Sequence, residues 1–319
     1  MLHKDITIEL LTSIQIHYLN KTRAYICAKI LNVGKDRIYR ELKEGLSIFD
    51  ILKKYNLNKS KCGREKIVLS SDKLLNIKLK LKNDHSLDSI CGRDKLMDAE
   101  ERCSTKTLYR IVKDGYLSSN LLRRKGKRKH NGQEETQGKI TNYKTILDRD
   151  TKYPFAKENL CFWHFEGDTI VGEKRKSAIV TLVDKHSKFI VLLKASRKSK
   201  DVYTAILNWS KKVNLSSVKS IIFDRGKEFA KWKEIEKSTK INIFFSDPGS
   251  PGQRGLNENS NGIVRKDLPK STDLSKHSQI KLNEVAHKWN SIPRKSLGYF
   301  TPKEVLKMAT GEDNFLPIA

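Results

Sequence analysis

The stretch Phe162-Trp163-His164-Phe165-Glu166-Gly167-Asp168-Thr169-Ile170-Val171-Gly172 reads as a β-strand, because aromatic and β-branched residues recur in it and a glycine ends it. Two further apolar runs follow at residues 177–183 and 188–193, and short polar turns separate the three runs. Short turns between successive strands are typical of an antiparallel meander. The stretch therefore predicts the first strand of a sheet, and this strand carries Asp168.

The segments after the meander alternate between helical and strand patterns. Apolar residues recur at helical spacing over 201–213 and 229–237, whereas 218–223 and 241–245 read as buried strands. A glycine- and proline-rich loop follows, and a helix is expected from Asn257 onward. This order predicts an α/β domain with a mixed five-stranded sheet and helices.

Three acidic residues fall at telling points of that layout: Asp168 on the first strand, Asp224 at the end of the fourth, and Glu258 in the last helix. Crowded carboxylates repel each other, but oxygen-preferring cations such as Mg²⁺ turn them into a binding site. Two such ions can activate a nucleophile and stabilise a leaving oxygen in phosphoryl transfer. Arg265 lies seven residues after Glu258 and shares its helical face, where it could grip a phosphate. Each acid also has a plainer interpretation, as a solvated strand residue, a helix cap or a helix-favouring residue.

The N-terminal part of the chain has a different, helical character. Apolar residues recur at helical spacing over residues 23–31 and 36–42, on either side of a turn at 32–35. This layout is typical of a helix-turn-helix, whose second helix enters the DNA major groove and would present Arg37, Arg40 and Lys43. A plain helical hairpin is the alternative.

A second such unit is expected over residues 86–117. One helix would begin near Ser86 and another near residue 104, with Ser104 or Thr105 as its N-cap. The second helix would present Lys106 and Arg110. The polar stretch 56–64 is expected to join the two units.

The balance of charge predicts a nucleic-acid partner. The chain has 64 Lys and Arg residues against 37 Asp and Glu residues, a formal net charge of +27. Lys and Arg gain affinity for a polyanion by releasing its counterions. The basic run at 121–130 is expected to be a linker that contacts phosphates, although it could also be merely solvated. A lysine-rich genome composition is the plainer explanation of the charge.

The lack of recognisable targeting signals and the pattern of cysteines favour a reducing, cytoplasmic location. The sequence shows neither an apolar stretch of 18 residues nor an apolar N-terminal segment, so we expect no membrane partner. Its five cysteines form no C-x-x-C pair, which predicts neither a disulfide framework nor a zinc site. The changes of composition predict five segments: helix-turn-helix 1–55, a second helix-turn-helix region 56–117, a basic linker 118–158, a catalytic domain 159–310 and a tail 311–319.

Three motifs carry a resemblance to a known family. They are Trp163-His164-Phe165-Glu166-Gly167-Asp168, Phe223-Asp224-Arg225-Gly226-Lys227-Glu228-Phe229 and Asp247-Pro248-Gly249-Ser250-Pro251-Gly252-Gln253-Arg254-Gly255-Leu256-Asn257-Glu258-Asn259-Ser260-Asn261-Gly262. In these motifs, and over nearly its whole length, the chain resembles the insertion sequence thirty family of bacterial transposases. The 33 residues between the second and third acid also agree with that family.

The resemblance implies a ribonuclease-H-like catalytic domain with a D, D, E triad. Asp168, Asp224 and Glu258 would hold magnesium or manganese, in two ions, and expose a 3′-hydroxyl that attacks DNA. The helical modules would bind the terminal inverted repeats of an insertion element, and a homo-oligomer is expected on double-stranded DNA. The candidate substrate-binding residues of the catalytic domain are Arg254, Asn257, Asn261 and Arg265.

The chain departs from the family at several positions. Trp163-His164-Phe165 stands where Gly-His-Trp is usual, Arg225 replaces an Asn, and Gly249 and Gly252 replace a Tyr and a Trp. The glycines would loosen a loop beside Glu258. Two alternatives therefore stay open: a plain metal-dependent nuclease, or a decayed copy that acts only as a DNA-binding protein or repressor.

Overall fold

The structure is a computed structural model. It describes residues 7–34, 47–61, 67–122, 140–156, 161–173, 177–213, 218–248 and 250–310. The chain forms two compact units, Met1–Val68 and Leu69–Ala319. The predicted helix 36–42, with Arg37, Arg40 and Lys43, lies outside the described residues, as do most of the basic run and the tail.

The first unit is helical and consists, in its described part, of α1 (Ile8–Leu19), α2 (Ala24–Leu31) and α4 (Ile48–Lys61). Leu11 on α1 packs against Ile51 on α4, while Ile14 packs against Cys27 on α2. Asn32 ends α2 in the left-handed conformation that the predicted turn requires. The expectation that 56–64 is only a connector was wrong for its first part, since residues 56–61 continue α4.

The second unit opens with three helices, α5 (Ser71–Lys82), α6 (Leu87–Leu96) and α7 (Thr105–Lys113). Their apolar faces share one core that contains Ile77, Ile90 and Leu108. Ser86 and Ser104 cap α6 and α7 by accepting from the backbone N–H three residues later, as the sequence indicates.

Side-chain contacts join this helical module to the rest of the second unit. Asp84, just after α5, accepts from Lys266 and from Lys288, each at 2.7 Å. On α6, Arg93 Nη1 donates to Glu304 Oε2 at 3.0 Å. A Cβ on Gly92 would meet the Tyr299 ring at 2.2 Å, so the two surfaces are in close contact. The three-helix module is thereby anchored to the C-terminal elements.

The predicted mixed sheet of five strands is confirmed, with spatial order β3-β2-β1-β4-β5. The strands are β1 (His164–Val171), β2 (Ala178–Asp184), β3 (Ile190–Ala195), β4 (Ser220–Phe223) and β5 (Asn242–Phe245). The first three pair antiparallel, as the meander predicts, and β1, β4 and β5 pair parallel.

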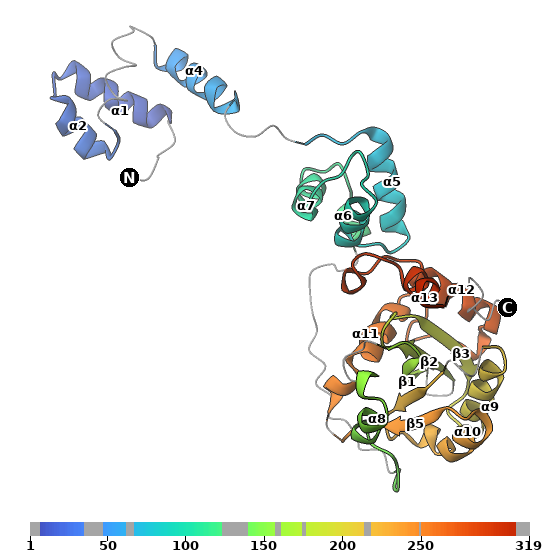
Figure 1. Cartoon of the computed structure of the whole chain (residues 1–319). Coiled ribbons are helices and arrows are strands. Elements are labelled where there is room, and N and C mark those ends of the chain that lie inside the picture. The colour runs from blue at the N-terminus through green and yellow to red at the C-terminus, as the bar shows by residue number, and fades with distance from the viewer. Residues whose placement is uncertain are drawn as a thin grey trace. The chain divides into compact units, whose positions relative to one another are not determined.

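Helices cover both faces of this sheet (Figure 1). One face holds Phe165, Ile221 and Ile243 and packs against α9 (Ser199–Ser210) and α10 (Trp232–Thr239). The other face holds Ile170 and Ile179 and packs against α11 (Gly255–Val264) and α12 (Gln279–Asn290). Since strand residues alternate between faces, Asp168 points to the side of α11. The last described helix is α13 (Pro302–Thr310).

One helix lies in the segment predicted as a basic linker. α8 (Ile146–Lys152) packs near β5, and Thr145 bridges to Phe245. Lys144 Nζ donates to Glu236 Oε1 at 2.8 Å. The expectation that all of 118–158 is a linker was therefore wrong for residues 144–152, which complete the catalytic domain.

His164, the first residue of β1, is buried beside its partner on β4. Its Nδ1 lies 2.7 Å from Ser220 Oγ, its ring packs edge-on against Tyr153, and the residue is 3% exposed. Burial, together with the charges of nearby Arg149 and Lys185, lowers the pKa of His164 to about 4. The neutral imidazole is thus the form that fits the fold.

We expect His164 to make the catalytic domain acid-sensitive. The pKa of His164 falls from 6.5 to about 4 on folding. The stability that the neutral imidazole contributes is therefore fully present above pH 6.5 and is lost as the pH falls toward 4. The loss amounts to about 3 kcal/mol of unfolding free energy. Urea unfolding followed by tryptophan fluorescence at pH 7 and 4.5 measures it. His164→Gln should flatten this pH dependence, whereas substitution of the exposed His287 should not; an unchanged slope in His164→Gln contradicts the prediction.

Candidate active site

The parallel pairing of β1 and β4 brings two acidic residues side by side. The parallel register aligns Glu166 with Ile222. If this register is continued for two residues, Asp168 lies level with Asp224. Both side chains lie on the α11 side of the sheet, Asp168 within β1 and Asp224 directly after β4. The two aspartates are thus near neighbours, and the charge of Asp224 acts on Asp168.

The Asp168 carboxylate accepts two hydrogen bonds. Its Oδ1 accepts from the Thr169 backbone N–H at 2.8 Å, and its Oδ2 accepts from Asn261 Nδ2 at 2.8 Å. Burial, together with the charge of Asp224, raises the pKa of Asp168 to about 6. A carboxylate pair with one raised pKa is a site that favours a cation.

The cation present between the aspartates is Arg254. Its Nη1 lies 3.8 Å from Asp168 Oδ1, and its Nη2 lies 3.6 Å from Asp224 Oδ2. Its buried Nε has no hydrogen-bond partner in the described part of the chain. Arg254 thus offsets the charge of both acids at longer range than a close ion pair.

We expect Arg254→Gln to destabilise the protein in the presence of a chelator, by about 1 kcal/mol, because two neighbouring carboxylates then lack a cation. Excess Mg²⁺ should shrink this difference, since an ion would replace the lost charge. Unfolding curves in chelator and in Mg²⁺ measure the effect, with Arg197→Gln as an exposed control. A loss of stability that is equal in both buffers would contradict the prediction.

The third predicted acid, Glu258, is not gathered with the aspartates. It lies exposed in the first turn of α11, three residues before the Asn261 that bonds Asp168. Across the described ranges, no three His, Cys, Asp or Glu side chains lie close enough to hold one metal ion together. Glu258 and Asn261 nevertheless share a helical face, because residues three apart are neighbours.

Glu228 is an acidic neighbour that the sequence analysis did not single out. Thr169 Oγ1 donates to Glu228 Oε1 at 3.1 Å, and the charge of Glu228 contributes to the raised pKa of Asp168. A Cβ on Gly226 would meet Glu228 at 2.8 Å and Asp224 Oδ1 at 2.9 Å. Gly226 therefore leaves room for two carboxylates. The signal available in the sequence is the four-residue spacing from Asp224 to Glu228.

Comparisons with known proteins agree with this geometry. Residues 161–251, which contain both aspartates, match the integrase core domain family. Over 300 residues the chain is 30% identical to the transposase for insertion sequence element IS4351 of Bacteroides fragilis, covering 90% of each protein. The chain belongs to the IS30 family of transposases.

A second curated transposase is consistent with that membership. The transposase InsI for insertion sequence element IS30C of Escherichia coli is 34% identical over 223 residues, which cover 67% of this chain and 57% of InsI. The crystal structure of the BIV integrase catalytic core covers 47% of this chain and 96% of its own length, at 16% identity and a TM-score of 0.36. The catalytic domain is of the integrase type, that of polynucleotidyl transferases.

The remaining predicted substrate-binding residues of this IS30-family chain occupy different settings. Arg265 Nη2 donates to the Val171 carbonyl at 2.8 Å, while its buried Nη1 has no partner among the described residues. Asn257 is 1% exposed, and its Oδ1 accepts from Thr181 Oγ1 at 3.3 Å. In contrast, Lys106 and Arg110 are exposed on α7. Among the candidate substrate-binding residues that the structure describes, only these last two are exposed.

The departures from the IS30 family also have distinct surroundings. The Arg225 guanidinium lies over the Tyr143 ring at 5.5 Å and donates to the Tyr143 hydroxyl at 3.3 Å. Specific contacts therefore hold this side chain in place. A Cβ on Gly252 would meet nothing within 4 Å. Gly249 lies outside the described residues. The open space at Gly252 borders a pocket that is described below.

Proposed function

We propose that the protein binds the terminal inverted repeats of its insertion element and catalyses metal-dependent DNA cleavage and strand transfer. The observation that carries the proposal is the proximity of Asp168 and Asp224, which share Arg254 as a neighbour and lie within the residues that match the integrase core domain. Crowded carboxylates at the end of a sheet suit phosphoryl transfer assisted by divalent ions. The proposed chemistry is that of a DNA transposase.

The residues present fit a divalent ion in part. Asp168 and Asp224 supply the hard oxygen ligands that Mg²⁺ and Mn²⁺ prefer, and their crowding favours a cation. The buried Oδ1 of Asn261 has no partner in the described part of the chain and lies on the residue that bonds Asp168. Glu258 would complete the set from the same face of α11. Bound ions, two in the proposed form, would supply Lewis-acid activation of the phosphodiester.

The chain's own residues would position the DNA. Arg254 and Arg265 both bring guanidinium groups near Asp168, where each could bind a phosphate oxygen. On α7, Lys106 and Arg110 lie four residues apart with Tyr109 beside them, and all three are exposed. This exposed face suits contact with double-stranded DNA. Joining two element ends would require a homo-oligomer on the DNA.

The second candidate function is DNA binding without cleavage. The exposed position of Glu258, apart from the two aspartates, is the observation that favours it. The purified chain, incubated with a labelled duplex that carries its own terminal repeat and with Mg²⁺ or Mn²⁺, distinguishes the two. Metal-dependent nicking or joining at the repeat end supports the transposase. Specific binding without cleavage in either metal supports the repressor, and cleavage without preference for the repeat supports a plain nuclease.

A further inference from the structure

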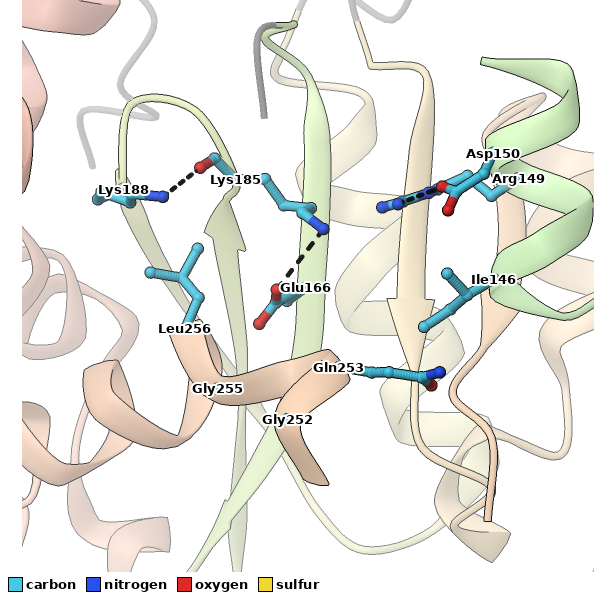
Figure 2. Close-up of a pocket in the computed structure, with 10 residues that line it drawn as sticks. All are labelled: Ile146, Arg149, Asp150, Glu166, Lys185, Lys188, Gly252, Gln253, Gly255 and Leu256. Atoms are coloured by element: carbon cyan, nitrogen blue, oxygen red, sulfur yellow. Dashed lines mark hydrogen bonds and ion pairs between the residues drawn. The ribbon is translucent and has the colours of Figure 1, made fainter. Parts of the chain in front are cut away.

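A polar pocket lies beside the paired aspartates, with a volume of about 310 Å³. Its walls come from α8, from β1, from the turn between β2 and β3, and from the start of α11. Figure 2 shows Glu166 pointing into this space, with Lys185 and Arg149 directed toward one another above it. The lining residues used below are Arg149, Asp150, Glu166, Lys185 and Lys188.

The charges of this pocket are not balanced. Three cationic residues face two acidic ones, and Lys185 Nζ lies no closer than 4.0 Å to Glu166 Oε1. The Lys188 ammonium donates to the Lys185 carbonyl, a neutral acceptor. Burial lowers the pKa of Lys185, and repulsion from the Arg149 guanidinium lowers it further. Two cations that repel each other across a cavity leave room for an anion between them.

The Arg149 guanidinium has an N–H group that is available to donate to such an anion. The residue is 2% exposed, and its Nε donates to Asp150 Oδ1 at 2.8 Å. Its Nη1 is buried and has no hydrogen-bond partner among the described residues. A buried guanidinium N–H without an acceptor carries a desolvation cost of about 1–3 kcal/mol, which an anion in the pocket would offset. Arginine pairs with phosphate in a fork geometry.

The pocket also lies at a suitable position for DNA. Glu166 and Asp168 are two residues apart on one face of β1, a rise of about 6.6 Å along the strand. Nucleotides follow each other by about 3.4 Å along the axis of a DNA strand. At the other wall, Gln253 and Gly255 line the pocket, while Arg254 between them contacts both aspartates. A strand at the aspartates would thus bring a nearby phosphate to the pocket.

We propose that this pocket binds a backbone phosphate of the DNA strand that the active site processes, through Arg149, Lys185 and Lys188. The inference rests on the proposed function, because it names a contact of that same substrate. Glu166 opposes the phosphate electrostatically. Its Oε2 accepts from the Asn257 N–H at 3.0 Å, which holds the carboxylate in place.

Lysine acetylation followed by mass spectrometry tests the pocket without requiring catalysis. The full-length protein is treated in chelator with inorganic phosphate alone, with a single-stranded oligonucleotide that ends in hydroxyl groups, or with neither. Both ligands should lower the acetylation of Lys185 and Lys188 at least about fivefold relative to exposed Lys194. Protection by inorganic phosphate only would overturn the DNA assignment, and protection by neither would overturn the site.

Two substitutions with opposite expected effects on phosphate affinity distinguish a binding role of the pocket from a structural one. In Lys185→Gln, the phosphate concentration that gives half-maximal protection of Lys188 should rise about tenfold, because a charge-assisted contact is lost. In Glu166→Gln, the phosphate concentration that gives half-maximal protection of Lys185 should fall, because the opposing negative charge is removed. The glutamine side-chain carbonyl can still accept from the Asn257 N–H. Lys200→Gln, which replaces an exposed lysine outside the pocket and keeps Lys194 as the reference, is the matched control and should leave these concentrations unchanged. Weaker binding in both pocket variants indicates a merely structural pocket and overturns the proposal.

Because these readouts need no cleavage, they can fail or succeed apart from the proposed function. A protein that cleaves its terminal repeat but shows no protected lysines retains the transposase activity and loses the pocket. A protein that shows protection by the oligonucleotide but no cleavage keeps the pocket as a DNA contact of the repressor.

Discussion

Asp224→Asn is expected to lower metal-dependent DNA cleavage at the terminal repeat about a thousandfold or more. Removing a group that stabilises charge in a transition state costs several kcal/mol, and the Asp224 carboxylate lies beside Asp168 and Arg254 at the proposed metal site. The amide can still accept from the Gly226 N–H, the bond that Asp224 Oδ1 makes at 3.0 Å. The variant therefore removes charge while it keeps the local turn.

Three measurements isolate that effect. Single-turnover cleavage gives the rate, binding to the uncut repeat should be unchanged, and urea unfolding should show no loss of stability. In chelator the variant should be the more stable protein above pH 6, because the neighbouring charge that raises the pKa of Asp168 is gone. Glu284→Gln, an exposed carboxylate on α12, serves as the control. Cleavage by Asp224→Asn within tenfold of the parent would remove Asp224 from the mechanism.

The largest effect on stability is expected at Phe223. This residue is fully buried, its ring stacks on Phe229 at 4.1 Å, and it directly precedes Asp224. Phe223→Ala should lower the unfolding free energy of the catalytic domain by about 3–5 kcal/mol, through lost burial and a cavity. All four tryptophans lie between residues 163 and 289, so their fluorescence reports this domain in the full-length protein.

Gly167 provides a complementary substitution. Its Cβ would meet the Phe223 ring at 2.2 Å, so Gly167→Ala alone should cost about 1–3 kcal/mol by overpacking. In the double variant Gly167→Ala/Phe223→Ala, the new methyl group enters space that the ring has left. The combined loss should therefore be smaller than the sum of the two single losses. Strict additivity would show that the glycine is not there to accommodate the ring.

Strand patterns were enough to predict the sheet. Of the three predicted acids, the structure brings Asp168 near Asp224 and leaves Glu258 exposed. Ser177 to Val183 is apolar and bounded by polar turns, and its strand is β2. A strand of alternating residues also fixes which face Asp168 occupies. These features depend on local sequence, and the parallel pairing of β1 with β4 follows from the helix that connects the meander to β4.

Other parts of the site depend on contacts that the sequence does not display. Residues 144–152 read as part of a polar linker, yet Lys144 finds Glu236 far along the chain. The pocket follows from that placement, since Arg149 on α8 meets Lys185 only in three dimensions. Glu228 lies near Asp168, and Gly226 leaves the room that Glu228 and Asp224 occupy. Glu258 is exposed in the first turn of α11, a placement that its helical pattern alone does not indicate.

The anchoring of Asp84 to Lys266 and Lys288, and of Arg93 to Glu304, has a consequence for how such proteins diversify. Residues that form an ion pair with each other must stay complementary in charge. We therefore expect the three-helix module and the catalytic domain to be inherited together. A crossover between Val68 and Leu69, at the boundary of the two compact units, leaves every one of these ion pairs intact. Recombination between related elements can therefore exchange the first unit alone, and an engineered chimaera should be joined at the same point.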